Sequence, residues 1–168
     1  MHRLLVLVLA LLAASASAPE ASAQFSAAPS GPTVRTADVV TWRVRADRAT
    51  PGASARLVLD AQIAPGWRLY AMGSPVGIPL TLALDPLPRG LAAGRVAQSE
   101  TRKRFDPAFD ADYTYFAEAA RIVQQVRVAP GAAAGSHPVT GAVRYAVCDD
   151  RVCLPPTRTA FRVALVVE

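Results

Sequence analysis

Apolar and polar residues alternate with a period of two along most of this chain. Such alternation is typical of β-strands that bury one face. Turn residues, including Thr50-Pro51-Gly52 and Pro130-Gly131, separate the alternating segments. The pattern predicts strands over residues 40–45, 56–63, 67–70, 80–84, 95–98 and 122–128.

The clearest alternation flanks the only two cysteines of the 168-residue chain. Residues 139–147 and 161–167 each place their apolar side chains on one face, and we expect them to pair as a hairpin. Pro155-Pro156 cannot donate hydrogen bonds to a sheet and is expected to mark the exit from the hairpin loop. Cys148 and Cys153 then lie where strands and loop meet, close enough to form a disulfide.

Seven or eight short strands with regular turn signals predict an all-β protein, an antiparallel β-sandwich of one domain. Residues 117–121 have a helix-forming composition, but we expect no more than one turn or a bend there. No convincing helix, internal repeat or second domain is predicted.

The least regular stretch is Glu100 to Phe116, which holds five of the eleven aromatic residues of the chain, Phe105 and Phe109 among them. One interpretation is a long connection whose rings fill one end of the core. The other is a mobile flap with a ring that covers a reactive site. Composition does not separate the two.

The N-terminus predicts export. A basic start, an apolar run over residues 4–14 and the small-residue sequence Ala21-Ser22-Ala23 are typical of a signal peptide, 1–23, cleaved after Ala23. Eleven apolar residues are too few for the roughly 20 that span a bilayer. Residues 24–37 are expected to form a flexible lead-in to a domain over 38–168. Export would allow a disulfide to persist.

Composition and charge narrow the function classes. The net charge is +5 and the pI about 9.9, but the arginines are scattered rather than gathered with aromatic residues, so we expect no nucleic-acid partner. Of the two histidines, His2 lies in the predicted signal peptide and His137 in a predicted turn. Two thiols and one distant imidazole do not make a zinc site, and we expect neither metal nor cofactor.

The residues themselves leave the chemistry of the cysteines open. A bridge within so short a loop stabilises by roughly 2 kcal/mol in the chain-entropy estimate, so a structural, a redox-active and a free-thiol state all remain. A redox pair needs an accessible sulfur and a resolving partner, which this loop offers. Asp149 and Asp150 should disfavour a thiolate at Cys148, whereas Arg151 should favour it.

The segment from Tyr145 to Pro156, Tyr-Ala-Val-Cys-Asp-Asp-Arg-Val-Cys-Leu-Pro-Pro, resembles the cysteine motif of the periplasmic N-terminal domains of the thiol:disulfide interchange protein DsbD. The motif also marks related single-domain disulfide bond correctors. Gly66-Trp67-Arg68-Leu69-Tyr70 resembles a strand of that family, and Phe105 is similar in place to the aromatic residue of its cap loop. The resemblance covers residues 38–168.

This resemblance implies an immunoglobulin-like sandwich that acts as a thiol–disulfide oxidoreductase module. A thioredoxin-like donor would reduce the disulfide, and the dithiol would reduce thioredoxin-fold acceptors in the periplasm. Cys153 would be the attacking thiol and Cys148 its partner, with Tyr70 lining the site. Phe105 would be the cap, with Phe109 as its rival.

The chain also departs from the family pattern. Acidic residues precede the cap phenylalanine in a known member, whereas Lys103 and Arg104 stand here, which leaves Asp106 or the loop aspartates as acidic groups. Neither a membrane domain nor a thioredoxin domain follows, so we expect separate partners for a monomer, including a membrane-embedded donor. The competing hypothesis is a non-catalytic exported binding module whose hairpin disulfide is structural.

Overall fold

The computed structural model describes residues 34–107 and 109–168 of the chain. The predicted signal peptide, 1–23, and residues 24–33 of the predicted lead-in lie outside the described residues. Within the unit from Val34 to Glu168 there are one short helix and eleven strands. In chain order they are α1 (Thr36–Val39), β1 (Val40–Ala46), β2 (Ser54–Ile63), β3 (Arg68–Tyr70), β4 (Thr81–Leu84), β5 (Leu91–Gln98), β6 (Arg102–Asp106), β7 (Ala111–Phe116), β8 (Ala119–Val128), β9 (Gly135–Tyr145), β10 (Val147–Cys148) and β11 (Thr157–Val167).

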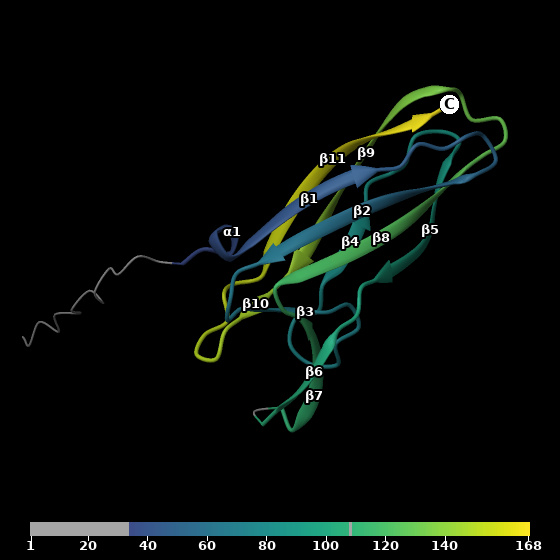
Figure 1. The fold of residues 1–168 in the computed structure, drawn as a ribbon. Helices are drawn as coiled ribbons and strands as arrows, with labels where there is room; N and C mark the ends of the chain where they lie inside the picture. Colours follow the sequence, from purple (N-terminus) through teal and green to yellow (C-terminus); the bar gives the residue numbers. More distant parts are fainter. Residues whose placement is uncertain (1–33, 108) are drawn as a thin grey trace, which may run out of the picture. The chain divides into compact units, whose positions relative to one another are not determined.

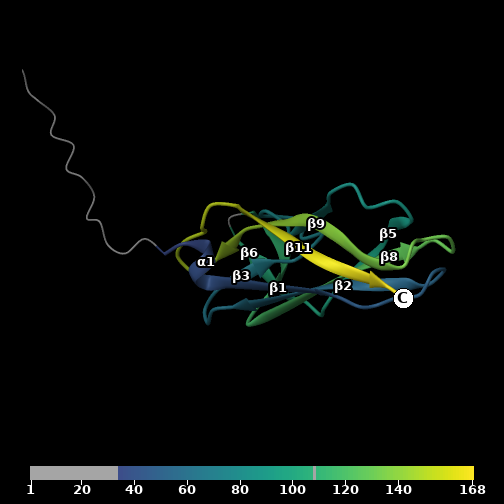
Figure 2. The same cartoon turned by 90° about the horizontal axis from the view of Figure 1, so that it is seen from above.

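The strands form three sheets of antiparallel pairs. Two of them, β1-β2-β8-β5 and β11-β9-β4, are the layers of the sandwich, and the third, β10-β3-β7-β6, lies at one end of them (Figure 1). At one edge β11 runs beside β1, where Ala49 and Val167 form a parallel bridge (Figure 2). The predicted all-β class is confirmed, and the architecture is an immunoglobulin-like antiparallel sandwich.

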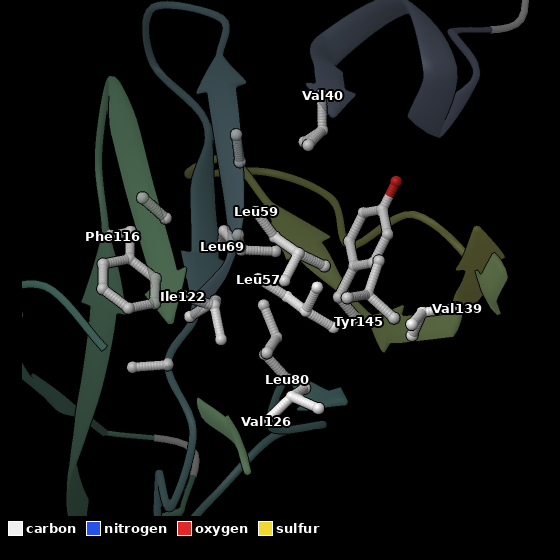
Figure 3. Close-up of a cluster of buried hydrophobic side chains, with 14 of the residues drawn as sticks. Val40, Leu57, Leu59, Leu69, Leu80, Phe116, Ile122, Val126, Val139 and Tyr145 are labelled. Carbon is white, nitrogen blue, oxygen red and sulfur yellow. The ribbon is translucent and has the colours of Figure 1, made fainter. Parts of the chain in front are cut away.

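The core lies between the two larger sheets because their strands alternate as the sequence predicts. β2 and β8 send large aliphatic side chains inward, and β9 and β11 send theirs to meet them. Figure 3 shows Leu57 between Ile122 and Tyr145 in this cluster. Residues with less than 2% exposure include Leu57, Leu59, Ile122, Val126, Val139, Val143, Tyr145 and Leu165. Each of the aliphatic side chains among them contributes about 1.5–3 kcal/mol by leaving water.

The predicted hairpin around the cysteines is confirmed. β9 and β11 pair without interruption from Gly135↔Val167 to Tyr145↔Thr157. Both strands are longer than the alternation indicated, and β11 begins directly after Pro155-Pro156. This hairpin forms a fixed base for the cysteine loop.

The sequence predicted an irregular connection over residues 100–116, and this prediction is wrong. β6 and β7 form a hairpin there, in which Phe105 lies opposite Asp112 (Figure 1). β6 leaves nearly all its side chains exposed, so it carries no apolar alternation from which a strand could be predicted.

Smaller differences occur at element boundaries. Residues 117–118 form the expected bend, with Glu118 at a φ of 68°, but β8 begins at Ala119 rather than at 122. β5 covers 91–98 rather than 95–98. α1 forms at the end of the predicted lead-in, where Thr36 is buried and its hydroxyl pairs with that of Thr157. No helix in the described ranges is long and apolar enough to cross a membrane.

Candidate functional site

The two cysteines form a disulfide at the end of the domain that holds the third sheet. After β9 the chain turns away from β11, and β10 pairs instead with β3, placing Cys148 opposite Arg68. The loop returns so that Cys153 bridges back to Cys148, with their Cα atoms 4.0 Å apart. Hydrogen bonds from Leu154 N to Val147 O and from Asp149 N to Val152 O close the loop.

The two halves of the disulfide differ in exposure. Cys148 retains only 6% of its surface, because it packs beneath Tyr70 and Tyr113, whereas Cys153 is exposed. An incoming thiolate can therefore approach Cys153 from solvent, and Cys148 would be the leaving sulfur.

Asp149 shapes the loop between the cysteines. Its carboxylate accepts hydrogen bonds from the backbone N–H groups of Arg151 and Val152, each at 2.7 Å. These bonds from Arg151 and Val152 lower the pKa of Asp149. The charge of Asp149 is thus engaged within the loop itself.

Asp150 joins three segments of the chain. Its Oδ1 accepts from Arg68 on β3 at 2.8 Å and from Arg104 on β6 at 3.1 Å. The hydrogen bond from Arg68 and then its charge lower the pKa of Asp150, and Arg104 adds to the effect. Arg104 thereby ties the β6–β7 hairpin to the cysteine loop.

Tyr70 contacts the buried sulfur. Its hydroxyl donates to Cys148 Sγ over 3.7 Å. Burial first, and then Tyr113, whose ring centroid lies 5.4 Å away, raise the pKa of Tyr70. Gly77 leaves room for this ring, since a Cβ there would lie 2.5 Å from it. The tyrosine therefore remains a neutral donor at physiological pH.

A cavity of about 280 Å³ lies over the disulfide. Its lining includes Arg68, Tyr70, Arg104, Phe105, Asp106, Pro107, Tyr113, Cys148, Asp149, Asp150 and Cys153. Most of the residues predicted for the site are thus brought together around one space, and the β6–β7 hairpin forms one of its walls.

The two candidate cap residues differ in position. Phe105 borders the cavity and is 52% exposed, whereas Phe109 is 59% exposed and is not among the lining residues. Arg104 and Tyr113 share one face of the hairpin, and Phe105 lies on the other with Asp112.

Sequence reasoning missed Arg68, Arg104 and Tyr113 as site residues. One signal was available for Arg68, which shares a strand face with Tyr70 two residues later. Asp150 pairs with Arg68, 82 residues away, and with Arg104, 46 residues away, and such distant pairs leave no local sequence pattern. His137 contacts Ala133 O, and the described part of the chain holds no group of three or more His, Cys, Asp or Glu residues placed to bind a metal.

The family model described as "Thiol:disulfide interchange protein DsbD, N-terminal" matches residues 37–165. The chain is similar in structure to the N-terminal periplasmic domain of ScsB from Proteus mirabilis, with 14% identity and a TM-score of 0.52, over 80% of this chain and 49% of that one. A reduced N-terminal domain of DsbD from Neisseria meningitidis aligns with 20% identity and a TM-score of 0.49, over 76% and 86% of the two chains. No curated protein matches the sequence.

Proposed function

The chain belongs to the family of N-terminal domains of the thiol:disulfide interchange protein DsbD, and on that basis we propose that it passes electrons between thioredoxin-like proteins through Cys148 and Cys153. The observation that carries this proposal is a disulfide with one exposed and one buried cysteine in a domain of this family. Exchange needs access to one sulfur and control of the other, and this arrangement offers both.

The reaction consists of two successive exchanges. A donor thiolate attacks Sγ of Cys153, the bond to Cys148 breaks, and the Cys148 sulfur leaves with the electron pair and takes up a proton. The second donor thiolate attacks the donor sulfur of the mixed disulfide, and Cys153 leaves and is protonated. The donor has become a disulfide and this domain a dithiol, by transfer of two electrons and two protons.

The same steps in reverse then reduce an acceptor. The thiolate of Cys153 attacks the acceptor disulfide, and Cys148 resolves the mixed disulfide by attacking Cys153. The acceptor leaves as a dithiol and the Cys148–Cys153 bond forms again. On this basis the domain is an oxidoreductase-type module that needs no metal or bound cofactor.

Groups around the buried sulfur assist its departure. The hydroxyl of Tyr70, 3.7 Å from Cys148 Sγ, donates a hydrogen bond that favours negative charge on the leaving sulfur. Asp149 and Asp150 would oppose that charge, but their carboxylates already accept from backbone N–H groups and from arginines. A stabilised leaving thiolate speeds exchange at the other sulfur.

The β6–β7 hairpin acts as the cap in this proposal. Phe105 borders the cavity over the disulfide, and Arg104 holds the hairpin against Asp150. Cys153 is already exposed, and displacement of the hairpin by a docking partner uncovers the buried Cys148. Until then the hairpin limits reaction of the dithiol with small disulfides.

Export to the periplasm with cleavage after Ala23 is part of the proposal. The predicted signal peptide supports it, and the structural relative from Proteus mirabilis is named as a periplasmic domain. Intact mass measured on protein recovered from a bacterial periplasm should correspond to a chain that starts at Gln24. Recovery of the uncleaved chain in the cytoplasm would contradict export.

Trapping of mixed disulfides tests the exchange itself. Cys148→Ser leaves Cys153 free, and it should capture a thioredoxin-fold protein that has lost its resolving cysteine. Cys153→Ser leaves only the buried sulfur and should capture far less. If neither variant captures any such protein, the disulfide is structural and the chain is better explained as a non-catalytic binding module.

A further inference from the structure

Three exposed arginines lie within or close in sequence to the cysteine loop. Arg144 and Arg158 lie directly opposite each other on β9 and β11, and Arg151 lies in the loop between the cysteines. None of these three takes part in an ion pair within the described residues. We call Arg144, Arg151 and Arg158 the basic rim.

The charge of the basic rim is not balanced from within its own sheet. β4, β9 and β11 contain no aspartate or glutamate. The nearby Asp150 is shared between two other arginines, and Asp149 accepts from backbone N–H groups of its loop. Two like charges directly opposite on neighbouring strands destabilise a sheet, and an acidic group placed against Arg144 and Arg158 would remove that repulsion.

The basic rim lies within reach of any protein that reacts with Cys153. Arg144 precedes Cys148 by four residues, which is at most about 13 Å of extended chain. A standard interface covers about 800 Å² of each partner, equivalent to a disc of roughly 16 Å radius. Arg144 therefore lies within that radius of the disulfide, and Arg158 lies beside it on the neighbouring strand.

We propose that the basic rim is a docking surface for a redox partner whose surface around its own reactive cysteine is acidic. This inference rests on the proposed function and adds the chemistry of the partner to it. Opposite charge at the contact accelerates encounter and turns the reactive cysteine of the partner toward the disulfide of this domain. Salt screens this attraction beyond about 8 Å at physiological ionic strength.

The test measures the rate at which a reduced thioredoxin of net negative charge reduces the oxidised protein. Stopped flow gives this rate at NaCl concentrations between 20 and 500 mM. Each rate is divided by the rate with dithiothreitol, a small neutral reductant, so that the intrinsic reactivity of the disulfide cancels. The wild-type ratio should fall about tenfold across this salt range.

The critical variant is Arg144→Glu with Arg158→Glu. It keeps two like charges opposite each other, so the strand pair retains similar repulsion while the sign of the rim changes. Its ratio at 20 mM NaCl should be at least about tenfold below that of the wild type, and the two should converge at 500 mM.

Arg89→Glu with Arg127→Glu is the matched control. Both residues are exposed and form no ion pair within the described residues. Arg127 lies opposite Ser54, and the ten residues of β2 separate that end from the disulfide end, about 30 Å away. This variant should change the ratio by less than about twofold.

If the ratio of the thioredoxin rate to the dithiothreitol rate is the same for all variants at every salt concentration, the basic rim is not a docking surface. The proposed exchange function would still stand. Failure of thioredoxin to reduce even the wild type at low salt, while dithiothreitol succeeds, would instead overturn the proposed function and with it the inference. A rate ratio that rises when the rim becomes acidic would contradict the stated charge of the partner.

Discussion

Two hairpins meet at the disulfide, and different forces hold them. The β9–β11 hairpin buries Val139, Val143 and Leu165 in the core, so it is part of the sandwich itself. In the other hairpin β6 leaves nearly all its side chains exposed and is tied to the cysteine loop through Arg104 and Asp150, whereas β7 buries Tyr113 and Phe116. Apolar burial fixes the first hairpin and, through Tyr113 and Phe116, the β7 strand of the second, whereas β6 is held by surface contacts. The site thus has a rigid base, and β6 is the part of the cover that can be released.

The largest expected effect is a difference in how much a substitution in each hairpin lowers the stability of the domain. Leu165→Ala should lower the free energy of unfolding by about 3 kcal/mol, because a fully buried leucine leaves a cavity. Phe105→Ala on β6 should change it by less than about 0.5 kcal/mol, because half of that ring is already exposed. Urea denaturation of both variants measures the difference. Equal losses would mean that Phe105 stabilises the domain as much as a core residue does.

Release of the cover is the next largest effect. Asp150→Asn weakens the pair with Arg104, so amide hydrogen exchange in residues 102–106 should become about threefold faster. Asp112→Asn is the matched control, since it removes the Lys103–Asp112 pair from the other face of the same hairpin. Faster exchange in the control but not in Asp150→Asn would contradict the role of Asp150.

The contact between Asp150 and Arg104 should weaken at low pH. Arg68 and then Arg104 hold the pKa of Asp150 below its ordinary value of about 3.9, so the bound carboxylate is favoured above that pH. The contribution is lost as pH falls through the lowered pKa. Hydrogen exchange of the hairpin, corrected for intrinsic rates, should therefore accelerate only below the ordinary value, and Asp150→Asn should abolish that step.

The smallest effect concerns the rings. Phe105→Ala should speed oxidation of the dithiol by a small neutral disulfide about twofold, because the ring borders the cavity over the sulfurs. Phe109→Ala should leave the rate unchanged, because Phe109 lies outside the lining. Thiol titration during the reaction measures both rates. An effect confined to Phe109→Ala would reverse the assignment of the cap.

The same contrast explains what the sequence could predict. Alternation of apolar residues in β9 and β11 follows from burial of one face, so both strands and the cysteine positions were predictable. β6 begins Arg-Lys-Arg and buries almost nothing, so its strand left no periodic signal. β10 leaves the sheet that contains β9 and pairs with β3, about 80 residues earlier in the chain. No local sequence pattern encodes a pairing over that separation.

The direct test of the whole account is the equilibrium potential of the Cys148–Cys153 couple, measured in thiol buffers by alkylation and mass. An exchange module should titrate above about −300 mV, within reach of thioredoxin-like reductants. A potential well below that value, with no reduction by thioredoxin in the folded state, would show a structural bridge and contradict the account.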